Sequence, residues 1–368
     1  MKQYIQKFLS DIPPLFDQRY IFFDIETTGL HAEHSILSLI GFLTLTDSTW
    51  TMIQLLNDDG ESESELIETF FSYLTNENIL IHYNGKTFDL PYIKKRCEQL
   101  NLSYTPLETI LHYDFYSFFK PCKTTFHLRD CKQQTLETWI GHTRTDTLSG
   151  KQCIEQYMLY LTRKNEQALN TFLLHNYDDL CGLSKLSFLF TLSEQINMID
   201  EEHTTYQLIT KQEQEYFFYE ISLPYSFPFS FHCNKQDVEL TIDNDTLQIM
   251  CPIVQESLKY FYPNYKDYYY LPLEDMAIHK SVSSFVDKNH RQKATKQTCY
   301  LKKFGTFLPT FEPLDPYPFY RSWGDKEPFF YLDSPFSFSV QQEWLYRLFR
   351  FLSLSSPLHN EEIPISLS

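Results

Sequence analysis

Apolar runs separated by short polar segments dominate the N-terminal part of the chain. Three such runs, at residues 20–25, 35–46 and 50–56, predict buried strands. Their short connections predict an antiparallel meander. Further strands are predicted at 79–83 and 109–115, and apolar residues at helical spacing predict helices at 61–74, 89–100, 132–140, 151–162 and 166–196. This order of elements predicts an α/β fold with a mixed five-stranded sheet flanked by helices.

The pattern changes from about residue 201. Alternating and aromatic stretches with turn residues predict strands within 216–253, and apolar spacing predicts a helix at 275–296. A hairpin around Phe304-Gly305 is predicted at 298–311. We therefore expect one domain over residues 1–200 and a smaller α+β domain over residues 201–368.

Composition agrees with a folded protein and sets one condition on its partners. Hydrophobic residues make up 42% of the chain, with 26 Tyr and 32 Phe, which suffices for a real core. The formal charge of −17 would repel nucleic acid from a uniformly acidic surface. A nucleic-acid partner therefore requires a local basic patch or bound divalent metal.

The chain also carries information about its compartment. Its 8 cysteines include no Cys-x-x-Cys pair, which favours reduced thiols over a disulfide framework or a zinc site. Residues 1–20 lack the apolar core of a signal peptide, and no run reaches the ~18 apolar residues of a membrane span. We expect a cytoplasmic protein without a membrane partner.

Carboxylates occur where predicted elements end or begin. Asp24 and Glu26 are two apart in a strand, so both side chains point to the same face and could bind a hard cation, or simply form a polar strand end. Asp89 begins a helix after the strand at 79–83, where it could be an N-cap or point toward the first pair. His175 and Asp179 are four apart and share one face of a helix.

Taken in order, these segments resemble the motifs of the DEDD superfamily of 3′–5′ exonucleases. The Asp-x-Glu-Thr-Thr-Gly motif is matched by Asp24–Gly29, the Asn-x-x-x-Phe-Asp motif by Asn84–Asp89, and the helical His and Asp by His175–Asp179. The stretch His127–Glu137 with the following Arg144 and Asp146 resembles one branch, the YprB-like proteins. The resemblance covers about residues 18–195 and implies an RNase H-like fold.

The resemblance also implies a mechanism and a set of site residues. Two divalent cations, Mg²⁺ or Mn²⁺, would be held by Asp24, Glu26, Asp89 and Asp179, and His175 would be the general base. In the histidine branch of the superfamily the histidine usually stands five residues before the aspartate, where this chain has Leu174. Asp178 is an alternative to Asp179 as a ligand. Contacts to the substrate strand are implied for Gly29, Leu30 and Asn84.

One segment of the second half reverses the sign of the overall charge. Residues 280–303 contain seven Lys or Arg and a single acid, Asp287. Basic residues interleaved with aromatics suit single-stranded nucleic acid, so Lys280, Lys288 and Arg291 are candidate substrate contacts. The alternative is a solvated face of the predicted helix, whose apolar stripe would include Val282 and Phe285.

These observations lead to three functional hypotheses. The first is a metal-dependent 3′–5′ exonuclease that acts on single-stranded DNA or RNA. The second is a catalytically weak nucleic-acid-binding or scaffolding protein on the same fold, since a fold does not establish a function. The third is an endonuclease that uses the same carboxylates. No residue identifiable in the sequence reads a 2′-hydroxyl, so DNA and RNA remain equal candidates.

Overall fold

The computed structural model of the protein describes residues 1–314 and 317–356, and it contains two compact units. The first unit comprises Met1–Leu192 and Phe227–Ser230, and the second comprises Ser193–Ser226 and Phe231–Ser355. All 8 cysteines are buried, and none is paired with another in a disulfide. Within the described ranges, every helix is too short or too polar to cross a membrane.

The first unit alternates strands and helices along the chain. Its strands are β1 (Lys2–Lys7), β2 (Tyr20–Thr27), β3 (Leu37–Thr46), β4 (Thr49–Leu56), β5 (Ile79–His82) and β6 (Leu111–Asp114). Its helices are α1 (Glu63–Ser72), α2 (Asp89–Leu100), α3 (Thr105–Glu108), α4 (Phe115–Phe119), the 3-10 helix η1 (Pro121–Lys123), α5 (Gln133–Trp139), α6 (Gly150–Arg163) and α7 (Glu166–Phe190). The helix expected at 166–196 is divided, because α7 ends at Phe190 and α8 (Leu192–Asn197) follows.

The strands form one mixed sheet in the order β1-β4-β3-β2-β5-β6. Strands β2, β3 and β4 are the predicted antiparallel meander, while β2, β5 and β6 run parallel. The α/β fold with a mixed sheet flanked by helices is thus confirmed, with one strand more than predicted. The added strand β1 escaped prediction because it is a mostly exposed edge strand without an apolar alternation.

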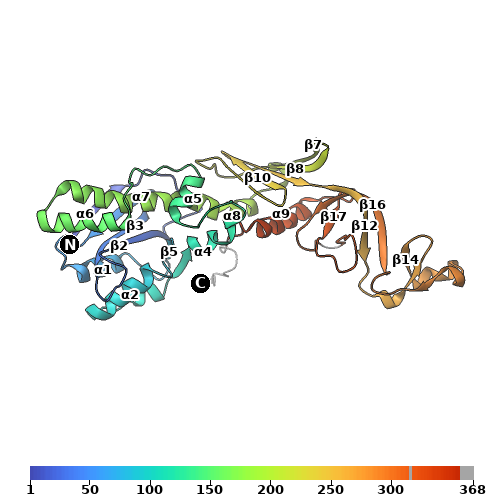
Figure 1. The fold of residues 1–368 in the computed structure, drawn as a ribbon, viewed down its shortest axis with the longest axis horizontal. Coiled ribbons are helices and arrows are strands. Elements are labelled where there is room, and N and C mark those ends of the chain that lie inside the picture. The colour runs from blue at the N-terminus through green and yellow to red at the C-terminus, as the bar shows by residue number, and fades with distance from the viewer. Residues whose placement is uncertain (315–316, 357–368) are drawn as a thin grey trace. The chain divides into compact units, whose positions relative to one another are not determined.

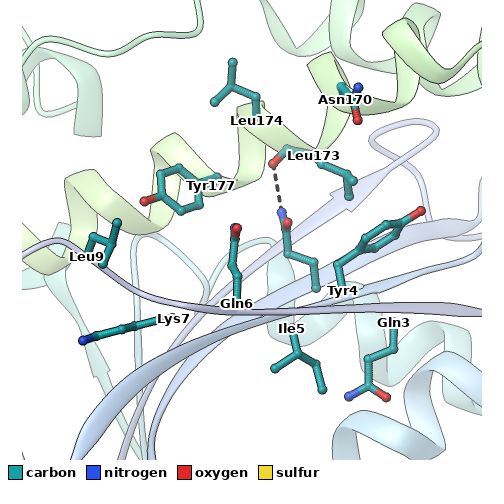
Figure 2. A pocket seen from close by; sticks show the side chains of 11 residues that line it. Gln3, Tyr4, Ile5, Gln6, Lys7, Leu9, Asn170, Leu173, Leu174 and Tyr177 are labelled. Carbon is teal, nitrogen blue, oxygen red and sulfur yellow. Dashed lines mark hydrogen bonds between the residues drawn. The ribbon is translucent and has the colours of Figure 1, made fainter.

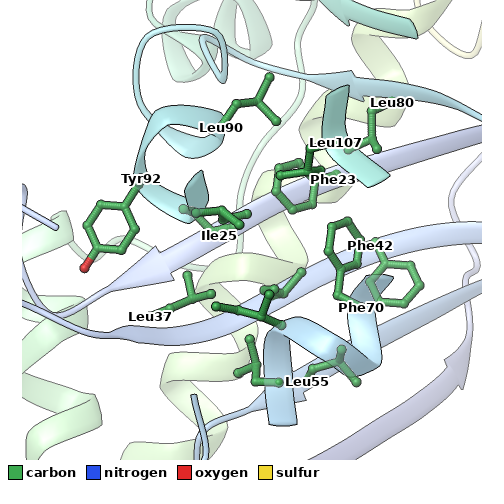
Figure 3. Close-up of a cluster of buried hydrophobic side chains, with 14 of the residues drawn as sticks. Phe23, Ile25, Leu37, Phe42, Leu55, Phe70, Leu80, Leu90, Tyr92 and Leu107 are labelled. Carbon is green, nitrogen blue, oxygen red and sulfur yellow. The ribbon is translucent and has the colours of Figure 1, made fainter. Parts of the chain in front are cut away.

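Helices cover both faces of this sheet (Figure 1). Strand residues that alternate with the carboxylates, such as Phe23 and Ile25, pack with Phe42 and Phe70 in a large core beneath α1 and α2 (Figure 3). The opposite face packs against α6 and α7 through a smaller cluster: Leu39, Leu56, Cys153, Tyr157, Tyr160, Leu169 and Phe172. Because successive strand residues face opposite sides, burying Phe23 and Ile25 directs Asp24 and Glu26 toward α7.

The second unit is built mainly from antiparallel strands. These are β7 (Thr204–Lys211), β8 (Gln214–Ser222), β9 (Phe231–Lys235), β10 (Val238–Asp243), β11 (Thr246–Pro252), β12 (Val254–Phe261), β13 (Tyr268–Leu271), β14 (Met276–His279), β15 (Gln292–Lys293), β16 (Tyr300–Pro309) and β17 (Phe329–Tyr331). Four 3-10 helices and one long α-helix complete it: η2 (Glu201–His203), η3 (Tyr265–Asp267), η4 (Lys280–Phe285), η5 (Lys288–His290) and α9 (Phe338–Leu352).

These strands form three separate sheets, with the orders β7-β8-β11-β10-β9, β12-β16-β17 and β14-β13-β15. Helix α9 packs against the strands through Trp344, which is fully buried and contacts Phe217 and Tyr219 edge-on. The Trp344 indole N–H donates a hydrogen bond to the Pro309 carbonyl at 2.9 Å. A Trp side chain that buries its ring and satisfies its N–H stabilises such a junction strongly.

The helix predicted at 275–296 is wrong. Residues 276–279 instead pair as β14 with β13, and two 3-10 helices, η4 and η5, follow. The predicted apolar stripe is not buried, since Val282 is 48% and Phe285 89% exposed. Cross-strand pairing with the tyrosine-rich β13 therefore overrides the local helical spacing.

The hairpin predicted around Phe304-Gly305 is also wrong. Gly305 lies in the middle of the continuous strand β16, where it pairs with Glu256 of β12. A Cβ at this position would come within 2.5 Å of the Tyr331 ring. The glycine thus marks a close approach between a strand and an aromatic ring rather than a turn.

Candidate metal and active site

Strand β2 supplies the first two carboxylates of the candidate site. Its pairing with β3 becomes irregular between Glu26 and Thr27, which ends the regular ladder just after the second carboxylate. Asp24 lies opposite Gly41 of β3. The side chains of Asp24 and Glu26 meet residues of α7, as their alternation with the buried Phe23 and Ile25 requires.

Asn176 of α7 ties the helix to Asp24. Its Nδ2 donates to Asp24 Oδ2 at 2.9 Å, and its Oδ1 accepts from Gln54 Nε2 at 3.0 Å. A Cβ on Gly41 would come within 1.9 Å of Asn176 Oδ1. Only glycine at this position of β3 therefore lets the amide reach Asp24. A glycine inside a strand often marks such a close approach, but it does not indicate which residue approaches.

Three carboxylates converge at the contact between β2 and α7. Oxygen atoms of Asp24, Glu26 and Asp179 lie within 4.8 Å of one another. Burial, followed by the charges of Asp179 and Glu26, raises the pKa of Asp24 well above its usual range. Burial also raises the pKa of Glu26 to about 8, with the charge of His175 opposing this rise. Without a cation, these carboxyl groups therefore keep their protons to a higher pH than usual, and full ionisation of the group is unfavourable.

Asp89 lies beside this group, although it is not one of the three. It begins α2, is 6% exposed, and accepts a hydrogen bond from the backbone N–H of Ile25. Strand β5 ends at His82, whereas its neighbour β2 continues past that point. Asp89 therefore accepts the Ile25 N–H where β5 no longer offers a strand partner. Burial raises the pKa of Asp89 to about 7, and its charge contributes to the raised pKa values of Asp24 and Glu26.

His175 faces the carboxylates with one ring nitrogen and a supporting aspartate with the other. Its Nε2 lies 3.9 Å from Glu26 Oε1 and 3.7 Å from Asp179 Oδ2, while Nδ1 is 2.5 Å from Asp146 Oδ2. Burial lowers the pKa of His175, but the charges of Glu26 and Asp179 and the hydrogen bond with Asp146 outweigh it, and the pKa is raised. Asp146 thus orients the imidazole.

The position of Leu174 explains why the histidine stands four residues before Asp179 rather than five. Leu174 lines a different surface of α7, a hollow of about 670 Å³ between this helix and β1 that is also lined by Leu173 and Tyr177 (Figure 2). Gln54 donates to the Leu173 carbonyl there, at 2.8 Å. A histidine at position 174 would therefore face the hollow, whereas position 175 faces the carboxylates.

The two adjacent aspartates of α7 have separate partners. Asp178 is buried and accepts the backbone N–H of Asp146 at 2.6 Å. Asp179 pairs with Arg144 Nη1 at 2.8 Å and lies in the carboxylate group. Asp178 therefore holds the loop that carries Asp146, and Asp179 is the one directed at the other carboxylates.

Arg144 pairs with two carboxylates at the site, one of which is Asp179. The other is the buried Glu137, at 2.5 Å from Oε2, and a Cβ on Gly182 of α7 would come within 1.7 Å of Glu137 Oε1. Arg144 and Asp146 were predicted only as parts of the stretch that resembles the YprB-like proteins, and no role was predicted for Asn176. These three residues act through ion pairs and hydrogen bonds that connect distant segments, which no local pattern reports.

The remaining predicted residues have varied surroundings. Leu30 is 79% exposed, and the Gly29 carbonyl accepts hydroxyl hydrogen bonds from Thr27 and Ser35. Asn84 occupies the left-handed region, with φ of 62°, and its N–H donates to Asp114 at 2.7 Å. The other three predicted contacts belong to the second unit: Lys280, Lys288 and Arg291.

The donor atoms suit a hard divalent cation. Asp24, Glu26 and Asp179 offer only carboxylate oxygens, the ligands that Mg²⁺ and Mn²⁺ prefer. A second possible group joins Glu26 to His175 and Cys153, whose Sγ is 3.8 Å from Glu26 Oε2. Burial raises the pKa of the Cys153 thiol far above its usual range, and a protonated thiol is a poor ligand. The oxygen group is therefore the better candidate.

The family profile described as the RNase_H superfamily matches residues 21–190. Together with the mixed sheet flanked by helices, this match shows that the first unit has an RNase H-like fold. The matched residues include every carboxylate of the candidate site.

Two polymerases match short segments of the chain. A DNA polymerase of Thermococcus sp. (strain 9oN-7) is 36% identical over 92 residues, which cover 23% of this chain and 12% of the polymerase. A DNA polymerase of Ostreid herpesvirus 1 is 40% identical over 52 residues, covering 12% of this chain and 3% of that protein. The chain thus spans only a small part of either relative.

Solved structures with partial similarity include polymerases and exonucleases. The family B DNA polymerase of the archaeon Pyrobaculum calidifontis has 11% identity and a TM-score of 0.37, with 67% of this chain and 35% of the polymerase covered. Exonuclease I of E. coli in complex with a dA16 oligonucleotide has 11% identity and a TM-score of 0.29, with 61% of this chain and 54% of the exonuclease covered.

Proposed function

We propose that the protein is a metal-dependent 3′–5′ exonuclease that hydrolyses phosphodiester bonds of single-stranded nucleic acid. One observation carries this proposal: Asp24, Glu26 and Asp179 bring oxygen atoms within 4.8 Å of one another on an RNase H-like sheet. Burying like charges so closely is costly unless cations offset them. The cluster is therefore best understood as a cation site.

Each carboxylate of the set has a role in this proposal. Asp24, Glu26 and Asp179 would hold the cations, with Asp89 beside them as the fourth ligand. Two bound divalent ions, Mg²⁺ or Mn²⁺, would supply electrostatic stabilisation to the phosphoryl group and a more acidic water. Asn176 holds the Asp24 carboxylate in place through its 2.9 Å hydrogen bond.

His175 would accept the proton of the attacking water. Asp146 accepts from Nδ1, so the Nε2 that faces the carboxylates is the nitrogen available for a proton. The charges that raise the pKa of His175 in the free protein come from Glu26 and Asp179. When cations offset these charges, the pKa falls toward the range in which imidazole is an effective base.

We propose two domains, over residues 1–200 and 201–368, each with its own contacts to nucleic acid. Gly29, Leu30 and Asn84 would contact the terminal nucleotides, and Leu30 is exposed enough to do so. Lys280, Lys288 and Arg291 would contribute backbone contacts to a longer strand. The short polymerase segments that match the chain are consistent with a nucleic-acid substrate.

The test is a panel of DNA and RNA strands labelled at the 3′ or the 5′ end, incubated with Mn²⁺ or with EDTA. We expect stepwise loss from the 3′ end with Mn²⁺, no reaction with EDTA, and no reaction by Asp24→Asn or Asp179→Asn. A circular strand separates modes of cutting, because an endonuclease opens it and an exonuclease does not. Undiminished release by either variant would sink the proposal.

A second candidate function is supported by Arg144. Because its guanidinium already pairs with Asp179 at 2.8 Å, one ligand of the proposed set is partly neutralised without a metal. This arrangement would suit a nucleic-acid-binding protein with weak or no cleavage. Calorimetric titration with Mn²⁺ distinguishes the two, because the nuclease must bind the cation and the binding protein need not.

A further inference from the structure

The second unit contains an aromatic pocket of its own on the β12-β16-β17 sheet. Its volume is about 530 Å³, within the roughly 300–1,000 Å³ typical of small-ligand sites. Four tyrosines, two phenylalanines and one lysine are among the residues that line it: Tyr260, Tyr262, Tyr317, Tyr331, Phe319, Phe330 and Lys303.

Strand register brings these side chains to one face. Tyr260 pairs with Leu301, Leu258 pairs with Lys303, and Phe307 pairs with Tyr331, so all of them share one side of the sheet. Gly305 belongs to the same row, and the missing side chain there leaves room for the Tyr331 ring. The Lys303 ammonium lies 4.5 Å from the centre of that ring.

The tyrosine rings around Tyr260 meet at steep angles. Tyr260 meets Tyr262 at 83° and Tyr317 at 89°, with ring centres 5.2 Å and 5.0 Å apart. Tyr262 also stacks on Tyr268, with ring centres 4.4 Å apart, so part of the aromatic surface is already covered. Tyr317 is 59% exposed, so a ligand can reach it from solvent.

Charge narrows the choice of ligand. Lys303 is the only charged residue among the described residues that line the pocket, in a protein of formal charge −17. The Asp333 carboxylate adjoins the pocket but is engaged with the Tyr331 hydroxyl, whose pKa it raises. A cationic ligand would be repelled by Lys303, and an aliphatic one would leave the tyrosine hydroxyls and the ammonium unused. A planar anion can stack on the rings, form hydrogen bonds with the tyrosine hydroxyls and pair with the Lys303 ammonium.

We propose that this pocket binds one nucleotide of a single-stranded nucleic acid, with its base against the tyrosine rings and its phosphate on Lys303. Stacking on aromatic rings and charge attraction by a lysine are the two elements of sequence-tolerant single-strand binding. The choice of ligand rests on the proposed nuclease function. The pocket itself is independent of the carboxylates and requires no metal.

The test measures binding of fluorescently labelled oligothymidylate and oligouridylate in EDTA, which keeps the strands intact. Tyr317→Ala and Lys303→Gln are compared with Tyr346→Ala and Lys326→Gln, exposed residues of the same types outside the pocket. We expect Tyr317→Ala to weaken binding by about 5- to 100-fold and Tyr317→Phe to restore most of it, because stacking needs the ring. The two control variants should bind like the parent.

Parent-like binding by both Tyr317→Ala and Lys303→Gln would overturn the proposal. So would equal losses in pocket and control variants, which would indicate diffuse charge rather than a site. Displacement of the strand by a tryptophan-containing acidic peptide, with no competition from free thymidine or uridine monophosphate, would assign the pocket to a protein partner. Failure of the nuclease proposal appears elsewhere, as absence of cleavage by the parent protein.

Discussion

The two units of the molecule arrange their charged side chains in opposite ways. In the first unit, Asp24, Glu26 and Asp179 crowd together in a partly buried group, with Asp89 beside them and Arg144 as the nearby cation. In the second unit, Lys303 stands among tyrosine rings with no acidic side chain in the described pocket wall, and Lys280 and Arg291 approach the Tyr269 ring.

This difference suggests how a protein of formal charge −17 could both bind and cleave a polyanion. Under the two proposals, the acidic region would accept a phosphate only after cations offset its charge, whereas the aromatic region would need no cofactor to attract one. Binding and chemistry should therefore respond separately to metal, to pH and to mutation.

The largest effect is expected for Asp24→Asn. Losing one cation ligand should reduce cleavage by about 1,000-fold, since such a ligand supports several kcal/mol of transition-state stabilisation. The same change removes a buried carboxyl group whose ionisation its neighbours oppose, so at alkaline pH the metal-free variant should be more stable by about 0.5–2 kcal/mol. Cleavage assays, urea unfolding and oligonucleotide binding in EDTA check the three responses. Loss of binding in EDTA would contradict the separation.

A smaller loss is expected for Asp146→Asn. Asparagine can still contact His175 Nδ1, but it neither carries the charge that helps hold the proton nor enforces the same tautomer. We expect about a 10- to 100-fold lower cleavage rate, with the acidic limb of its pH profile displaced. An unchanged profile at reduced rate would indicate that Asp146 only supports the fold.

Packing around Asn176 predicts a contrast between two glycines. Gly41→Ala would place a Cβ within 1.9 Å of Asn176 Oδ1, so it should cost about 1–3 kcal/mol and weaken metal binding. Gly150→Ala is the matched control, because a Cβ there meets nothing within 4 Å and the residue begins α6. Its stability should be unchanged or slightly higher. Equal stability of the two variants, by urea unfolding, would refute the tight approach to Asn176.

The pH dependence of stability gives the most gradual effect. Burial raises the pKa of Glu26 from 4.5 to about 8 and that of Asp89 from 3.8 to about 7. Between about pH 4 and pH 8, the metal-free native state therefore binds more protons than the unfolded chain. Their contribution to stability is fully present below about pH 4 and is lost as pH rises to about 8, with a slope of about 1.4 kcal/mol per pH unit for each proton.

Urea unfolding of metal-free protein across this pH range measures that slope. Glu26→Gln should flatten it, and saturating Mn²⁺ should stabilise the protein more at pH 8 than at pH 6, because protons must leave before the cation binds. Parallel slopes for the parent and Glu26→Gln would show that Glu26 does not titrate in this interval.

Local sequence patterns determined most of the first unit. The apolar runs specified the meander and the parallel strands, because a buried strand must present apolar residues whatever its neighbours are. Helix α2 begins and ends at the predicted residues 89 and 100. Patterns failed where burial was absent, as in the exposed edge strand β1, and where pairing outweighed spacing, as in β14.

The sequence by itself also determined which residue types and spacings could form a cation site, since Asp24 and Glu26 share a strand face and His175 and Asp179 share a helix face. Only the tertiary structure decided which supporting residues complete it. Asn176 reaches Asp24 because Gly41 leaves room, and Arg144 pairs with Asp179 across a gap of many residues. Such contacts depend on distances between elements, and those distances are set by packing rather than by any periodicity along the chain.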